Sequence, residues 1–164
     1  MRVFNMKKAS FFVWLVFCFS FLACNSSFAV FFSSDKLQLD RQMENLVNSG
    51  VEHLKNTTKE QAYKDFSDVH GKFINGIDYL FVYDFQGKCL AHGGNQEYVG
   101  KNLLSHKDKF GIQVIKLLIQ VAKSGGGFAG YYWLNPKTGK EQFKISYVKA
   151  IDKDTLIGTS HPIP

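Results

Sequence analysis

The chain has 164 residues, 45% of them hydrophobic and 21% charged, and a formal net charge of +6 at pH 7. Three of the twenty basic residues and none of the fourteen acidic ones lie in residues 1–29, so the remaining chain carries a net charge of only +3. No run of clustered lysine and arginine remains there, which argues against a nucleic-acid groove and a polybasic membrane patch. About 135 residues suffice for one domain with a hydrophobic core.

The first 29 residues have the order of a secretory signal peptide. Three basic residues come first, an apolar run follows at residues 11–24, and Ser27-Phe28-Ala29 closes the segment. The run is short for a membrane span, and the closing residues resemble an A-x-A cleavage site. We therefore expect cleavage after Ala29 and release into the periplasm or the exterior.

Two other fates of this segment stay open. Phe21-Leu22-Ala23-Cys24 resembles a bacterial lipoprotein box, which would place a lipid anchor on Cys24. An uncleaved anchor helix is the third possibility. Cys18 and Cys24 both belong to the segment, so its removal leaves Cys89 alone and excludes an internal disulfide. Cys89 then packs as a small hydrophobic residue or stays a free thiol.

Two helices are expected next. Apolar residues at three- and four-residue intervals predict a long amphipathic helix over residues 35–56, with Asp35 as its N-cap. The apolar stripe consists of Leu39, Met43, Leu46, Val47, Gly50 and Leu54. Thr58 and Gln61 form a capping box, which predicts a shorter helix that continues through Asp65.

The period then changes to that of a β-hairpin. Residues 79–83 alternate as a strand covered on both faces, residues 84–87 supply a tight turn, and residues 88–92 return as the second strand. A glycine-rich loop at 93–111 leads into the next amphipathic segment. There the apolar spacing predicts a helix over residues 112–123, which the glycines that follow it end.

The last part of the chain reads as a meander of three strands. They are expected at residues 127–134, 140–149 and 155–160, with turns between them. Strands joined mainly by hairpins favour an α+β fold with an antiparallel sheet over a doubly wound one. We predict five antiparallel strands, a long N-terminal helix, and a helix between the second and third strands.

An ordered series of short motifs runs from Leu39 to Thr159. After the leading helix it comprises GIDYLFVYDFQGKCLAH at residues 76–92, Tyr98-Val99-Gly100-Lys101-Asn102, Lys107-Asp108 with Gly111, the strand from Gly126 to Trp133, Asn135-Pro136 with Thr138-Gly139-Lys140, Lys144 with Ser146-Tyr147-Val148, and Leu156-Ile157-Gly158-Thr159. In this order the series resembles the single Cache family of extracytoplasmic sensing domains, which have a PAS-like fold. The resemblance implies that residues 30–164 form one single Cache domain.

A small-molecule pocket needs aromatic walls and a few convergent polar groups. Tyr131 and Trp133 share one face of their strand, and the hairpin that follows brings Lys144 beside them. Two aromatic walls, a hydroxyl and a fixed cation suit a small carboxylate. His92 and Asp108 are further candidate ligand contacts. Each of the five also has a purely structural interpretation, as core aromatic, solvated lysine, hydrogen-bonding histidine or loop cap.

Metal, haem and catalytic chemistry are not indicated. Cys89 and His92 are three residues apart on a strand, which by alternation places them on opposite faces, and the haem signature Cys-x-x-Cys-His is absent. No nucleophile elbow, phosphate loop or carboxylate pair occurs. We therefore expect a binding module without cofactor, not an enzyme.

Cache domains usually lie between two membrane helices of a chemoreceptor or kinase, whereas this sequence stops soon after the last expected strand. We therefore expect an exported sensor domain for a small carboxylate or similar metabolite, which acts through a separate membrane receptor, kinase or transporter. The alternative is an interaction or accessory protein that keeps the Cache fold and binds no ligand.

Overall fold

The computed structural model describes residues 34–135 and 138–163, so the expected signal peptide lies outside the described residues. The chain divides into two compact units, residues 1–39 and 40–164. In the first unit, residues 34–39 are helical. Within the described ranges, no helix combines the length and hydropathy that crossing a membrane requires.

The helices follow the sequence expectations closely. Residues 40–55 of the second unit are helical, as are residues 34 and 35, so Asp35 is not the N-cap that we expected. The shorter helix α2 (Lys59–Ser67) is capped as predicted, because the Thr58 hydroxyl accepts from the Gln61 N–H at 3.2 Å. Helix α3 (Val114–Lys123) begins two residues later than expected and ends before a run of glycines with positive φ.

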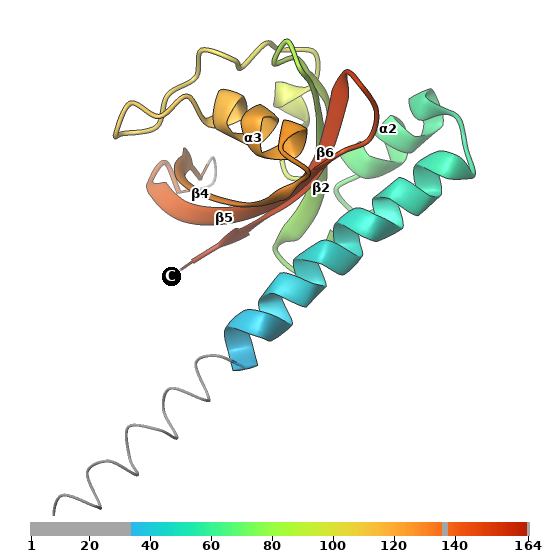
Figure 1. Ribbon diagram of the computed structural model, residues 1–164, viewed down its shortest axis with the longest axis horizontal. Helices are drawn as coiled ribbons and strands as arrows, with labels where there is room; N and C mark the ends of the chain where they lie inside the picture. Colours follow the sequence, from blue (N-terminus) through green and yellow to red (C-terminus); the bar gives the residue numbers. More distant parts are fainter. Residues whose placement is uncertain (1–33, 136–137, 164) are drawn as a thin grey trace, which may run out of the picture. The chain divides into compact units, whose positions relative to one another are not determined.

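The sheet is antiparallel in every strand pair that the structure describes. Its strands are β1 (Ile74–Asn75), β2 (Asp78–Asp84), β3 (Cys89–His92), β4 (Gly127–Leu134), β5 (Glu141–Ala150) and β6 (Thr155–Pro162). They lie in the order β1-β2-β6-β5-β4, and β3 pairs with β2 (Figure 1). The mixed α+β fold is thus confirmed. All five predicted strands are present. The two-residue strand β1 was not predicted, because it is too short to show the alternation of apolar and polar residues that marks a strand.

Alternation along β2 separates two hydrophobic cores. Phe81 and Tyr83 point to one face of the sheet, where α3 packs against β4 and β5; we call this the α3 face. Leu80 and Val82 point to the other face, where α2 packs; we call it the α2 face. The sheet is therefore covered on both sides in its central part, as the unbroken apolar run of β2 predicted.

A glycine allows the long helix to approach the α2 face closely. A Cβ atom added at Gly50 would lie 2.6 Å from Leu80 Cδ1 and 2.7 Å from Ile157 Cδ1. Val47, one turn away, is fully buried in the same core. The cost of glycine in a helix is thus offset here by tight packing of the helix on the sheet.

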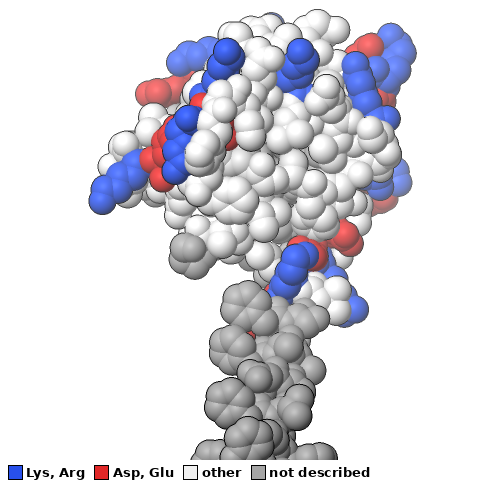
Figure 2. All heavy atoms as spheres, turned by 60° about the vertical axis from the view of Figure 1, so that its left-hand side comes forward, with Lys and Arg blue, Asp and Glu red and all other residues white. Residues whose placement is uncertain are grey.

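Charged side chains gather at the edges of the surface shown in Figure 2. Basic and acidic side chains lie interspersed there, and the middle of that face is uncharged. This face therefore presents no continuous basic stripe of the kind that tracks a nucleic-acid backbone.

Candidate functional site

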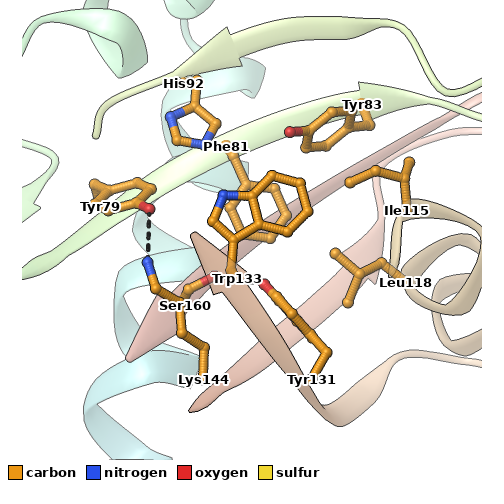
Figure 3. Close-up of a pocket in the computed structure, with 10 residues that line it drawn as sticks. All are labelled: Tyr79, Phe81, Tyr83, His92, Ile115, Leu118, Tyr131, Trp133, Lys144 and Ser160. Carbon is orange, nitrogen blue, oxygen red and sulfur yellow. Dashed lines mark hydrogen bonds between the residues drawn. The ribbon is translucent and has the colours of Figure 1, made fainter. Parts of the chain in front are cut away.

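A small cavity lies on the α3 face of the sheet, between the strands and α3 (Figure 3). Its volume is about 20 Å³, enough for one water molecule. The residues that line it are Tyr79, Phe81, Tyr83, His92, Ile115, Leu118, Tyr131, Trp133, Lys144 and Ser160. Aromatic rings and aliphatic side chains form most of the wall, and a few polar groups converge on it.

The structure brings four of the five candidate residues to this cavity: His92, Tyr131, Trp133 and Lys144. The strand register explains three of them. Tyr131 and Trp133 are two residues apart on β4 and therefore share a face, and Lys144 on β5 lies directly opposite Tyr131. Parity along one hairpin thus places two rings and a cation together, as the sequence predicted.

Lys144 is the charged group of the cavity. Its side chain is buried, with 8% of the residue exposed, and its ammonium donates to the Tyr79 hydroxyl at 3.3 Å (Figure 3). Among the residues that the structure describes, it forms no ion pair with a carboxylate. Burial lowers the pKa of Lys144, and the charge of Asp78 acts against that lowering. The cavity therefore holds a cation that lacks a direct counter-ion.

His92 is buried and neutral. Its Nδ1 accepts from the Asn95 N–H at 2.9 Å, so in the neutral ring the proton resides on Nε2. Burial, and secondarily the charge of Lys144, lower the pKa of His92 to about 3. The rings of Tyr79 and Tyr98 lie 4.9 and 5.1 Å from the imidazole, between centroids. His92 thus supplies a neutral polar edge and not a second cation.

Three hydroxyl groups from three strands form a closed network beside Lys144. The Tyr131 hydroxyl lies 2.6 Å from Ser146 Oγ and 3.0 Å from Ser160 Oγ, and the two serine oxygens are 2.6 Å apart. Burial raises the pKa of Tyr131, so its hydroxyl stays protonated at neutral pH. The three hydroxyl protons are used within the network, which therefore satisfies these polar groups in an environment that excludes bulk water.

Trp133 connects the cavity to the loop between β3 and α3. Its ring is 4.5 Å from the ring of His106 and 5.9 Å from that of Tyr98, between centroids. Tyr98 belongs to the short helix η1 (Gln96–Tyr98) within this loop. The loop thus rests on the aromatic wall of the cavity.

Asp108, the fifth candidate, does not line the cavity. Its carboxylate accepts from the N–H groups of Phe110 and Ile112, both at 2.9 Å, and of Tyr132 at 3.3 Å. Burial opposes ionisation of Asp108, but these backbone hydrogen bonds outweigh it and its pKa is lowered. Because Tyr132 lies on β4, an edge strand, Asp108 ties the loop to the edge of the sheet.

The expectation that Cys89 and His92 lie on opposite faces is wrong. The pairing of β2 with β3 shifts between Val82 and Tyr83, so Cys89 lies opposite Tyr83 and His92 opposite Phe81, both on the α3 face. The Cys89 thiol is free and buried, and burial raises its pKa to about 12. Among the described residues, no group of three metal-ligating side chains occurs.

Sequence reasoning missed several residues of the cavity wall. Tyr79 and Tyr83 were assigned to a strand but not to the site, although their alternation with Leu80 and Val82 already placed them on one face. Ser160 was missed because a single serine near the end of a strand carries no local signal. Its place in the network follows only from the pairing of β5 with β6, which sets it opposite Ser146.

Comparison with known proteins gives consistent matches. A family model described as a Cache domain matches residues 33–163. The sensor histidine kinase MctS of Rhizobium johnstonii is 41% identical over 82 residues, which are 49% of this chain and 18% of the kinase. The chain therefore spans less than a fifth of that relative's length.

Two solved structures resemble the chain over most of its length. A methyl-accepting chemotaxis protein from Vibrio parahaemolyticus has a TM-score of 0.67 and 27% identity, covering 79% of this chain and 94% of that one. A structure that presents the basis for carboxylic acid recognition by a Cache chemosensory domain has a TM-score of 0.60 and 20% identity, covering 85% and 98%. At 20% identity the second shows the fold alone.

Proposed function

The chain belongs to the Cache domain family, and on that premise we propose that it is an extracytoplasmic sensor module whose cavity binds a small carboxylate. The family is one of sensor domains, and the matched proteins are a chemotaxis receptor and a sensor kinase. The proposal assigns no reaction and no cofactor to the cavity.

The observation that carries the proposal is the buried ammonium of Lys144. A buried charge is costly unless it is paired, and among the described residues Lys144 has a hydroxyl and no carboxylate within hydrogen-bond distance. A ligand carboxylate would supply a counter-ion in direct contact with the ammonium. Lysine suits this role as a point charge, and the flat rings of Tyr79 and Trp133 suit the short apolar part of such a ligand.

The polar groups around Lys144 suit the oxygens of a carboxylate. The Tyr79 hydroxyl accepts from Lys144 and keeps its own proton to donate, and neutral His92 adds an N–H without adding charge. One cation fits one carboxylate, so we propose a monocarboxylate. The similar Cache chemosensory domain, whose structure concerns carboxylic acid recognition, supports the same chemical class.

Binding requires the cavity to widen. A volume of about 20 Å³ holds one water molecule and not the three or more heavy atoms of a carboxylic acid. The loop between β3 and α3 packs behind the cavity wall, where Tyr98 and His106 contact the ring of Trp133. We propose that ligand favours a conformation in which this loop has moved, which is a population shift that a partner can detect.

The place of the protein in the cell follows from the same proposal. We propose that residues 1–29 direct export and are removed after Ala29, with lipid anchoring at Cys24 as the alternative, and that residues 30–164 act as one sensing domain. A separate membrane receptor, kinase or transporter would read its state. The similarity to sensor domains of a chemotaxis receptor and a histidine kinase supports a partner of the receptor or kinase class.

A thermal-shift and calorimetric titration of the full chain with acetate, propionate and pyruvate tests the proposal. A ligand at one hundred times its Kd stabilises the folded state by about 2.7 kcal/mol, so a rise in Tm of several degrees is expected. Lys144→Met should abolish this rise. Lys149→Met is the matched control, since Lys149 is exposed on the same strand, and it should leave the rise intact.

Equal responses of the two lysine variants would show that Lys144 is not the carboxylate site. A wild-type Tm that none of the three acids changes would favour the alternative of an interaction protein that retains the fold without a ligand.

A further inference from the structure

A second charged group lies behind the cavity, on the other face of the sheet. Asp78 is 4% exposed, and its Oδ1 is 2.8 Å from Nδ1 of His161. Continued by two residues, the register that pairs Leu80 with Thr159 places Asp78 directly opposite His161, so the two form a cross-strand pair of β2 and β6. The proposed carboxylate site does not include either residue.

Strand alternation places Asp78 on the face of the sheet opposite to the cavity. Its neighbour Tyr79 points into the cavity and accepts the hydrogen bond from Lys144, whereas Leu80 and Asp78 point to the α2 face. Along β6, Ser160 faces the cavity and His161 the opposite side. The Asp78–His161 pair therefore lies on the opposite face of the sheet from the cavity, one residue along β2 and β6 from Tyr79 and Ser160, which line it.

The charges of Asp78 and Lys144 act on each other across the sheet. Lys144 and Asp78 are both buried, so water screens their interaction poorly. The Asp78 charge raises the pKa of Lys144 against the effect of burial. Burial raises the pKa of Asp78, and the hydrogen bond from His161, the charge of His161 and the charge of Lys144 oppose that rise. Burial raises the pKa of Tyr79, and the charge of Asp78 contributes to that rise to a smaller extent.

We infer that Asp78, held in place by His161, is the internal counter-charge of Lys144 and thereby limits how strongly the cavity binds anions. The inference rests on the proposed function for its ligand, but the coupling of the two side chains does not. Asp78 does not contact the ligand. It affects anion binding through its effect on Lys144 and through the repulsion between its own negative charge and the anion. A stronger anion site would lack Asp78.

Asp78→Asn tests this inference because it removes the charge and keeps the shape. In the ligand-free full chain, the pKa of Lys144, followed by NMR of labelled lysine side chains, should fall. At pH 7 the Kd for propionate should become about tenfold lower, because the anion no longer meets a nearby negative charge. Asp78→Ser removes the same charge with a smaller side chain and must move both measurements in the same direction.

Asp65→Asn is the matched control. Asp65 also pairs with a histidine, at 2.6 Å from Nε2 of His53, but acts on none of the cavity residues. Its substitution should leave the Lys144 titration and the Kd unchanged. In the Asp78→Asn background, His161→Gln should change the Kd by less than about twofold, because His161 acts through Asp78.

The outcomes separate this inference from the proposed function. An unchanged Lys144 titration in both Asp78 variants would overturn the inference, whether or not propionate binds. A titration that shifts in a protein that binds none of the carboxylates would support the internal counter-charge and contradict the proposed ligand. Weaker propionate binding by Asp78→Asn would overturn the inference that the charge of Asp78 weakens anion binding.

Discussion

The two faces of the sheet contain different kinds of core. The α2-face core consists of aliphatic side chains and phenylalanines, and the buried Asp78 lies on this face outside that cluster. The members of the cluster are Val47, Ala62, Phe66, Phe73, Leu80, Val82, Ala91 and Ile157. On the α3 face, tyrosines, a tryptophan and a cysteine share the interior with Lys144, His92 and two buried serines. Dry packing on one face therefore supports polar groups on the other that do not favour folding by themselves.

The largest loss of unfolding free energy is expected from a core substitution on the α2 face. Leu80→Ala should lower the free energy of unfolding by about 3 kcal/mol, because Leu80 is fully buried between the sheet and the helix that carries Gly50. Chemical denaturation measures this loss. The exposed Leu134 gives a matched control, whose replacement by alanine should cost less than about 0.5 kcal/mol. Similar losses at both positions would mean that the α2 face does not dominate stability.

Acid should reveal the polar character of the α3 face. The pKa of His92 is about 3 in the folded chain and about 6.5 when unfolded. The unfolded state thus binds the proton more readily, and folding free energy is lost as the pH falls from about 6.5 towards 3, at up to about 1.4 kcal/mol per pH unit.

His92→Gln should therefore make the free energy of unfolding less dependent on pH between about 6 and 4. Denaturant titrations at several pH values measure that slope. His70→Gln is the control, since His70 is exposed and should leave the slope unchanged. A wild-type slope that survives in His92→Gln would show that another group causes the acid sensitivity.

The smallest effect on stability is expected at Lys144, and with the opposite sign. Lys144→Met removes a buried charge that forms no direct ion pair among the described residues and keeps most of the apolar stem, so it should raise the free energy of unfolding by about 1 kcal/mol. The same substitution should abolish carboxylate binding, so stability and binding change in opposite directions. Lys149→Met should change neither, and a destabilised Lys144→Met variant would indicate a structural role for the lysine.

Much of the architecture could be predicted because its signals are local. The capping box at Thr58 fixed the start of α2, and apolar spacing located α3 to within two residues. The grouping of Tyr131, Trp133 and Lys144 followed from alternation across one hairpin, whose register is regular over eight residue pairs. Short-range geometry of this kind depends on the backbone and not on the rest of the fold.

One prediction was wrong because it assumed a regular strand pairing. Alternation placed Cys89 and His92 on opposite faces, but the register shift beside Tyr83 inserts an extra residue and reverses that result. Asp108 was grouped with the ligand contacts because of its residue type and its place in the loop, and that assignment stays a prediction. Its actual partners are backbone N–H groups, including that of Tyr132 on β4, which is far away in the sequence.

The sequence by itself determined the order of the helices and of the five longer strands, and the faces of β2 and β4. Each of these depends on residues within a few positions of one another, where periodicity is set by backbone geometry. Only the tertiary structure decided that Lys144 is buried without an ion pair, that Ser160 joins Tyr131, and that Asp78 lies behind the site with His161. These features depend on which strands become neighbours, because long-range strand register sets them and no local pattern encodes it.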